Sequence, residues 1–221
     1  MITQVEILYE DEVLVVCRKP AGIPVQTARQ GQPDMISILR NRYARKKQYT
    51  EIFPIHRLDQ PVEGVMVFAR TKEAASSLSR QVQEKEMDKY YLAIVAGIPS
   101  SESGCLEDYL CKDGRTNMSK VVPKGTPHAK FAKLSYQVVK KYENKSLVQI
   151  KLETGRHHQI RVQLAHAGYP LVGDKKYNSS QQEVYLPIGL CSVRITFCHP
   201  ITGKKMDFKV SPIGEAFEKN R

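Results

Sequence analysis

The amino-acid sequence predicts a single α+β domain over residues 1–221, in which many strands pack with a few helices. A chain of 221 residues of which 41% are hydrophobic is long enough to bury a sizeable core. Segments with the alternation or the β-branched content of strands outnumber segments with helical spacing. The sequence also contains no internal repeat and no convincing linker, so we expect one domain rather than several.

The N-terminal half predicts strands and helices in alternation. Residues 5–20 indicate two short strands around an acidic turn, and residues 62–70 have the β-branched density of a buried strand. A helix is expected from Asp34, which is a suitable N-cap, and a second helix follows Thr71, where apolar residues recur at helical spacing. Residues 90–97 then return to the pattern of a strand.

The C-terminal half predicts two hairpins and one helix. Residues 99–127 are rich in Ser, Gly and Lys, so we expect a loop with little regular structure. Residues 133–153 alternate like a half-buried hairpin that turns near residue 143. Residues 159–168 indicate a helix that ends at its glycine, and residues 193–210 indicate a second hairpin.

The positive charge of the chain favours a polyanionic partner. Lys and Arg number 34 against 23 Asp and Glu, which gives a formal net charge of +11. Much of the excess lies in residues 112–145 and in a short run without acids, which comprises Arg40, Arg42, Arg45, Lys46 and Lys47. These patches favour phosphate contacts, and the alternative for the short run is the solvated end of a helix.

Compartment and membrane association are also indicated by the sequence. The five cysteines form no CxxC pair, which is typical of reduced thiols in a cytoplasmic protein. No apolar stretch is long enough to cross a bilayer, and the N-terminus lacks the features of a signal peptide. We therefore expect a cytoplasmic protein without a membrane partner.

Two segments combine several polar functional groups beside apolar runs. In the first, Asp59 follows Arg57 by two positions and precedes a turn into the buried strand. In the second, residues 152–161, a strand-to-helix turn contains Arg156 and Arg161. A nearby arginine lowers the pKa of a carboxyl group, which then stays ionised and can act as a nucleophile. The same residues can equally form an ion pair that pins a turn to a helix.

Other kinds of chemistry find weaker support in the sequence. His158 and His166 could share a helix face while His157 points elsewhere, but no suitable acid, HExxH or CxxC accompanies them. The GxSxG elbow of serine hydrolases and the GxxxxGK[ST] phosphate loop are both absent. We expect neither a metal nor a cofactor, and a metal-dependent hydrolase or deaminase that uses the histidines is an alternative.

Four blocks of the sequence resemble, in order, the RluA family of RNA pseudouridine synthases. The signature block is HRLDQPVEGVMVFARTKEAA, and the second block is LETGRHHQIRVQLAHAGYPLVGDKKY, with a TGRxHQIR helix and a GD-x-x-Y turn. The opening EILYEDEVLVVCRKPAGIPV resembles the first strands and KPAG turn, and LCSVRITFCHPITGKKMDF resembles the final hairpin. The resemblance implies the pseudouridine synthase catalytic fold, with a mixed, largely antiparallel central sheet, flanking helices and loops, and a central cleft.

The resemblance also implies roles for single residues in the isomerisation of uridine to pseudouridine in rRNA or tRNA. Asp59 matches the aspartate nucleophile, and Arg161 matches the arginine that pairs with it. Tyr91 matches the tyrosine that lies against the uracil ring, and the adjacent Tyr90 is the alternative for this position. Arg57 matches an arginine that enters the RNA beside the extruded base.

RNA contacts are expected over a wider set, made of motif residues near the target base and the basic run: Arg57, His56, Leu190, Arg156, Arg40, Arg42, Arg45, Lys46 and Lys47. The chain departs from the usual family pattern at Val62, Glu63 and Cys191. It begins directly at the catalytic block, without the accessory RNA-binding domain of many relatives, and we expect a monomer. The alternative function is that of a catalytically silent relative that binds RNA as a chaperone or assembly factor.

Overall fold

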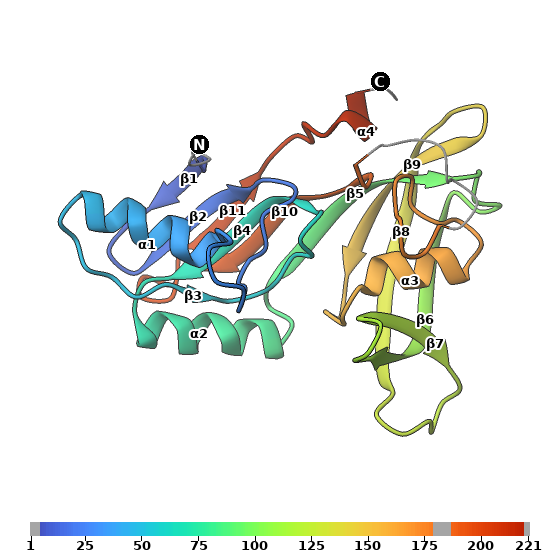
Figure 1. The fold of residues 1–221 in the computed structure, drawn as a ribbon. Helices are drawn as coiled ribbons and strands as arrows, with labels where there is room; N and C mark the ends of the chain where they lie inside the picture. Colours follow the sequence, from blue (N-terminus) through green and yellow to red (C-terminus); the bar gives the residue numbers. More distant parts are fainter. Residues whose placement is uncertain (1–4, 179–186, 219–221) are drawn as a thin grey trace. The chain divides into compact units, whose positions relative to one another are not determined.

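The computed structural model describes residues 5–178 and 187–218. The chain divides into two compact units (Figure 1). Unit 1 contains residues 1–89 and 192–212, and unit 2 contains residues 90–191 and 213–221. Two strands, Asp88–Ala96 (β5) and Leu190–Cys198 (β10), begin in one unit and end in the other.

Unit 1 is built on a sheet of short strands, in which β1 and β4 run antiparallel to β2 and β11 runs antiparallel to β10, with one helix on each face (Figure 1). Its strand order is β1-β2-β4-β10, with β3 paired to β4 and β11 paired to β10. Besides β10, the strands are Ile7–Glu10 (β1), Leu14–Lys19 (β2), Phe53–Pro54 (β3), Glu63–Ala69 (β4) and Lys205–Lys209 (β11). Every residue of β4 is buried, because this central strand is covered on both faces.

The helices of unit 1 begin at the predicted caps. In helix Met35–Arg45 (α1), Asp34 accepts a hydrogen bond from the Ser37 amide, and the Ser37 hydroxyl accepts one from the Asp34 amide. In helix Lys72–Gln83 (α2), the Thr71 hydroxyl accepts from the Ala74 amide. Both helix predictions are confirmed.

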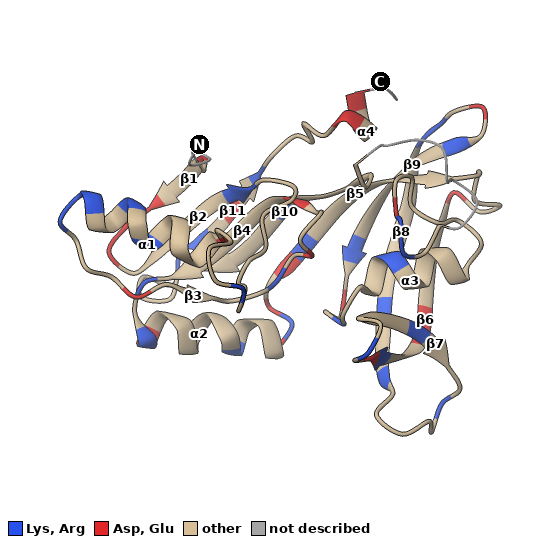
Figure 2. Cartoon of the chain, in the orientation of Figure 1, with Lys and Arg blue, Asp and Glu red and all other residues tan. Residues whose placement is uncertain are grey.

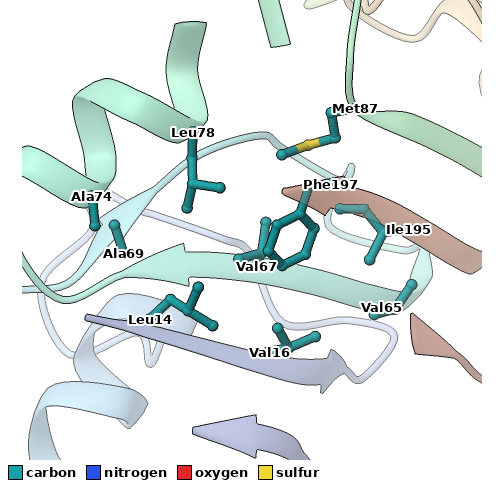
Figure 3. Close-up of a cluster of buried hydrophobic side chains, with 10 residues drawn as sticks. All are labelled: Leu14, Val16, Val65, Val67, Ala69, Ala74, Leu78, Met87, Ile195 and Phe197. Atoms are coloured by element: carbon teal, nitrogen blue, oxygen red, sulfur yellow. The ribbon is translucent and has the colours of Figure 1, made fainter. Parts of the chain in front are cut away.

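The core of unit 1 lies between α2 and the sheet. Alternate residues of the strands point to the same face, and those of β2, β4 and β10 meet Ala74 and Leu78 of α2 there (Figure 3). The strand residues of this cluster are Leu14, Val16, Val65, Val67, Ala69, Ile195 and Phe197. This packing holds β4, and with it the turn that precedes β4, in a rigid sheet.

Unit 2 contains a second antiparallel sheet with one helix against it. The strand order is β5-β9-β8-β6-β7. Besides β5, the strands are Ser103–Asp113 (β6), Met118–Val122 (β7), Lys130–Lys141 (β8) and Lys145–Leu152 (β9). Helix Gln159–His166 (α3) packs through Val162 on Leu110 and Ala132, and the short helix Glu215–Glu218 (α4) follows near the C-terminus.

The prediction of a loop over residues 99–127 is wrong. Residues 103–113 and 118–122 form β6 and β7, and β6 pairs with β8 along eight residues. The side chains of β6 are mostly exposed or half-buried, so the segment has the polar composition of a loop although its backbone is fully paired. The α+β fold class is confirmed, whereas the central cleft and the single domain stay predictions.

Candidate active site

The turn that precedes β4 alternates between buried and outward-facing side chains. His56 and Leu58 are 9% and 7% exposed, whereas Arg57 is exposed and Asp59 is half-buried. The two buried residues anchor the turn in unit 1. The arrangement therefore directs the two residues with predicted chemical roles, Arg57 and Asp59, away from the core.

Lys19, at the end of β2, fixes the chain that follows Asp59. Its side chain is completely buried, and Nζ donates to the carbonyl oxygens of Pro20 (2.9 Å), Gln60 (3.0 Å) and Val62 (2.7 Å). Three acceptors match the three N–H donors of an ammonium group. The Gly22 amide also donates to the Gln60 carbonyl at 2.9 Å. The residues directly after Asp59 are thus bound to the KPAG turn.

Two carboxylates offset the burial of this cation. Burial lowers the pKa of Lys19 to about 7, and the charges of Asp59 and Glu63 oppose that shift. Glu63 is only 4% exposed. This departure from the usual family sequence therefore lies inside unit 1, where it stabilises Lys19 rather than facing a nucleic acid.

Gly64 allows β4 to approach the neighbouring strand. Its φ of +131° is a conformation that L side chains rarely adopt, and a Cβ at this position would overlap the backbone of Ser192. The Ser192 hydroxyl donates to the carbonyl of Val65 at 3.2 Å. A side chain at residue 64 would therefore displace the start of β4 and the turn attached to it.

His56 is an internal hydrogen-bond acceptor. Its Nε2 accepts from the Val67 amide at 3.4 Å, and Nδ1 has no hydrogen-bond partner among the described residues. Burial, together with the charge of Lys89, lowers the pKa of His56 to about 3, so the ring is neutral at neutral pH. This position suits an anchor of the turn better than the RNA contact that the sequence predicts.

In unit 2, Gln159 organises the turn that leads into α3. Its side-chain oxygen accepts from the Thr154 hydroxyl at 2.8 Å and from the Arg156 amide at 2.9 Å, and its nitrogen donates to the Lys133 carbonyl. Arg156 is exposed, and its Nε donates to the carbonyl of Phe131 at 2.8 Å. The guanidinium of this predicted RNA contact is thus held at the surface beside β8.

Arg161 lies on α3 and is only 4% exposed. Its Nε and Nη2 donate to the two carboxylate oxygens of Asp174 at 2.8 and 2.7 Å. The Tyr177 ring centroid lies 5.3 Å from the guanidinium carbon. The structure therefore gives Arg161 a carboxylate partner within unit 2 that the sequence did not reveal.

The histidines at the start of α3 belong to a network of hydrogen bonds. The Ser119 hydroxyl bonds with His157 Nδ1 at 2.9 Å, the Tyr177 hydroxyl bonds with His158 Nδ1 at 2.8 Å, and the two rings are stacked 3.8 Å apart. His158 has a φ of +54°. Within residues 5–178 and 187–218, no group of three or more His, Cys, Asp or Glu side chains could hold a metal ion.

The register of β5 distinguishes the two adjacent tyrosines. Tyr91 pairs with Ile150 and is 5% exposed, whereas Tyr90 pairs with Lys151, whose amine lies 5.6 Å from the Tyr90 ring. Across β9 and β8, Tyr91 shares a sheet face with Ala132, which packs on α3. Tyr91 therefore lies on the same face as Arg161, and Tyr90 lies on the opposite face.

The remaining predicted residues fall into two groups. Leu190 and Cys191, at the start of β10, are 4% and 0% exposed. In the basic run, Arg42 and Lys46 form ion pairs with Glu10 at 3.2 and 2.8 Å, and the other three cations are exposed. Figure 2 shows Lys and Arg positions, in blue, along α1 and at its end. The ion pairs weaken the case for RNA contacts at Arg42 and Lys46, and leave Arg40, Arg45 and Lys47 as the stronger candidates.

The structure brings the predicted site residues together in two sets. Arg57 and Asp59 share one turn of unit 1, and Tyr91, Arg161 and Leu190 belong to unit 2. Sequence reasoning missed four residues that support these sets, namely Lys19, Glu63, Asp174 and Tyr177. Lys19, Asp174 and Tyr177 stand in the KPAG and GD-x-x-Y motifs, so the sequence marked these positions. It did not show their roles, because those depend on contacts with residues distant in sequence.

The chain is similar to proteins of one family over most of its length. A family model described as RNA pseudouridylate synthase matches residues 13–166. An "Uncharacterized RNA pseudouridine synthase" of Chloroflexus aurantiacus is 36% identical over 196 residues, which cover 86% of this chain and 60% of that protein. "Ribosomal large subunit pseudouridine synthase D" of Pseudomonas aeruginosa is 35% identical over 228 residues, which cover 97% and 70%.

Solved structures share the fold. "Human RNA Pseudouridylate Synthase Domain Containing 4" has a TM-score of 0.78 and 24% identity, with 94% of this chain and 88% of that chain covered. "Human RNA Pseudouridylate Synthase Domain Containing 1" has a TM-score of 0.79 and 20% identity, with 96% and 85% covered.

Fold and motifs together define the class of protein as an RNA-modifying isomerase. The chain belongs to the RNA pseudouridylate synthase family, because the family model covers well over half of it and the matched segment contains Asp59, Tyr91 and Arg161. It spans 60% and 70% of the length of the Chloroflexus aurantiacus and Pseudomonas aeruginosa relatives.

Proposed function

We propose that the chain converts specific uridines of structured RNA to pseudouridine, with ribosomal RNA as the first substrate to test and transfer RNA as the second. The observation that carries the proposal is the position of Asp59 in the matched segment. Asp59 is half-buried in a turn, and Lys19 binds the carbonyl oxygens of Gln60 and Val62, which follow it. Relatives such as that of Pseudomonas aeruginosa are named for the large ribosomal subunit, which is why ribosomal RNA comes first.

The reaction requires no oxidant, reductant or energy source, because substrate and product are isomers. The bond between the ribose and N1 of uracil breaks, a bond from the ribose to C5 forms, C5 loses its proton, and N1 gains one. An ionised carboxylate is needed to attack either the sugar or the ring, and Asp59 supplies it in this proposal. Tyr91 lies against the uracil ring and assists removal of the C5 proton.

Two arginines complete the proposed site. Arg161 takes the role of the arginine that, in the family, is paired with the aspartate nucleophile. The target base must leave its stack before it can react, and the exposed guanidinium of Arg57 fills the vacancy. Arg156 and the exposed cations of the basic run bind phosphates.

The substitution Asp59→Asn tests the proposal because it keeps the shape of the side chain and removes the nucleophile. Wild-type and variant protein are incubated with ribosomal RNA transcripts, and pseudouridine is mapped by carbodiimide modification and primer extension. We expect RNA binding to persist and pseudouridine formation to fall by at least about 1,000-fold, as for loss of a nucleophile that acts with partner groups.

Asp207→Asn, a change at an exposed ion pair of unit 1, serves as the control and should retain full activity. Unchanged modification by Asp59→Asn would contradict the role of Asp59. A wild-type protein that binds RNA without modifying it would support the catalytically silent alternative.

We also propose that the protein acts as a monomer in the cytoplasm. Among the helices of residues 5–178 and 187–218, none has the length and apolar character needed to cross a bilayer. Sedimentation of the purified chain across a range of concentrations tests the oligomeric state.

A further inference from the structure

Arg161 and Asp174 form a side-on pair in the interior of unit 2. The side chains of the two residues are 5% and 0% exposed. Nε and Nη2 of the guanidinium donate to the two oxygens of one carboxylate, at 2.8 and 2.7 Å. A planar guanidinium bound through two parallel hydrogen bonds has a defined plane and a defined direction in that plane. The pair therefore determines an orientation as well as a charge balance.

The carboxylate of Asp174 is itself held by the backbone. Its Oδ1 accepts from the amides of Lys176 (2.9 Å) and Tyr177 (3.3 Å), and the Asn178 amide donates to the Asp174 carbonyl at 3.0 Å. These bonds form a tight turn in which the aspartate side chain caps the residues that follow it. The position of the carboxylate is thus fixed by the main chain, independently of Arg161.

Tyr177 restricts the guanidinium from a second direction. Its ring centroid is 5.3 Å from Arg161 Cζ, close enough for a cation–π interaction. The ring is immobilised at its far end, where the hydroxyl accepts from the Ser119 amide at 2.7 Å and bonds with His158 Nδ1 at 2.8 Å. The same turn therefore supplies two partners of the Arg161 guanidinium: the carboxylate of Asp174 and the ring of Tyr177.

We propose that Asp174 and Tyr177 are positioning residues that hold the guanidinium of Arg161 in one orientation, with its Nε and Nη2 groups on the Asp174 carboxylate. The inference rests on the proposed function, in which Arg161 serves the active site. Arginine has four rotatable side-chain torsions, so its reactive geometry depends on such restraints. A misplacement of about 1 Å can reduce a rate by about 100-fold.

The first test compares two side-on Arg–Asp pairs of the same chain. Asp207 binds Arg194 Nε and Nη2 at 2.8 and 2.7 Å, but both side chains are 37% exposed. We expect Asp174→Asn to lower kcat by about 100-fold with KM for RNA nearly unchanged. Asp207→Asn should stay within about twofold of wild type, as usual for exposed pairs. Circular dichroism and thermal melting confirm that each variant is folded.

A double variant separates positioning from a general structural effect. If Asp174 acts through Arg161, then Arg161→Met with Asp174→Asn should be no slower than Arg161→Met alone, because the group being positioned is already absent. Losses that multiply in the double variant would overturn the inference, and so would a normal kcat in folded Asp174→Asn.

Should Asp174→Asn fail to fold, the comparison of Tyr177→Phe with Tyr177→Leu decides, because Phe keeps the ring face against Arg161 and Leu removes it. We expect the Phe variant to be at least about tenfold faster than the Leu variant, and equal rates would overturn the inference. An inactive wild-type protein, or a fully active Arg161→Met, would instead count against the proposed function itself.

Discussion

Each unit of the molecule holds one proposed reacting group with a buried ion, but the two do so differently. In unit 1, the cation of Lys19 binds three backbone carbonyls around the turn of Asp59. In unit 2, the anion of Asp174 binds the side chain of Arg161 directly. Lys19 thus holds the main chain beside Asp59, whereas Asp174 holds the guanidinium of Arg161 itself.

The difference follows from the lengths of the two side chains. Aspartate has two side-chain torsions, so a fixed backbone already confines its carboxylate to a small region. Arginine has four, and burying it without partners would leave many orientations and an uncompensated charge. A short reactive group can be positioned through its backbone, whereas a long one needs partners at its far end.

The substitution Lys19→Met, which removes the hydrogen bonds of Lys19 in unit 1, should have the largest effect on stability and activity. This change removes the donor of the buried Val62 carbonyl and a donor from the part-buried carbonyls of Pro20 and Gln60, and each buried group left unsatisfied costs about 1–3 kcal/mol. We expect the free energy of unfolding in urea to fall by about 3 kcal/mol or more, together with loss of pseudouridine formation. The matched control is Lys46→Met, at a partly exposed ion pair, with an expected cost of about 0.5 kcal/mol. Equal unfolding midpoints for the two variants would show that the Lys19 contacts do not support the turn.

A smaller effect concerns His56, which anchors the start of the same turn. Its pKa is about 3 in the folded protein, against an ordinary value of 6.5. Between these values the unfolded chain binds a proton that the folded chain does not, so the free energy of unfolding decreases as the pH falls below 6.5. The slope attributable to this group is at most about 1.4 kcal/mol per pH unit.

Urea unfolding of wild type and His56→Gln between pH 7 and pH 4.5 measures this contribution, and the variant should have the shallower slope. His166→Gln, at an exposed position of unit 2, should keep the wild-type slope. Parallel slopes for wild type and His56→Gln would mean that the ring does not anchor the turn as a neutral acceptor.

The smallest expected effect concerns the contribution of the basic run in unit 1 to RNA binding. Replacing Arg40, Arg45 and Lys47 with Gln should reduce the slope of log binding constant against log salt by about 2 to 3. The pair Arg42→Gln with Lys46→Gln should change it by less, because Glu10 already partners both cations. A slope unaffected by the triple substitution would assign the run to a solvated helix end.

The sequence predicted those elements whose signal is local. The caps at Asp34 and Thr71 and the alternation of β8 and β9 each depend on neighbouring residues, and all are confirmed. Strands β6 and β7 were missed because exposed sheet residues such as Glu107 and Lys120 have the composition of a loop. Only the pairing of β6 with β8, about 20 residues or more along the chain, and of β7 with β6 reveals them as strands.

The site shows the same division between local and distant signals. Asp59, Tyr91 and Arg161 stand in recognisable motifs, whereas the contacts that hold the turn and the guanidinium join residues far apart in sequence. Lys19 reaches carbonyls 41 and 43 residues away, and Tyr177 accepts from an amide 58 residues away. Such partners depend on how the strands are arranged, which no single segment encodes.

The order in which the ribosome makes the chain also matters for unit 1. Strand β10 lies beside β4, yet residues 192–198 are synthesised about 120 residues after β4 ends. At about 5–20 residues per second, the edge of β4 that faces β10 is without its neighbouring strand for roughly 6–25 s. Residues 90–191 of unit 2 are contiguous and emerge within that interval. During synthesis β4 is therefore an edge strand, paired with β2 on one side only, although it is a central strand of the finished sheet.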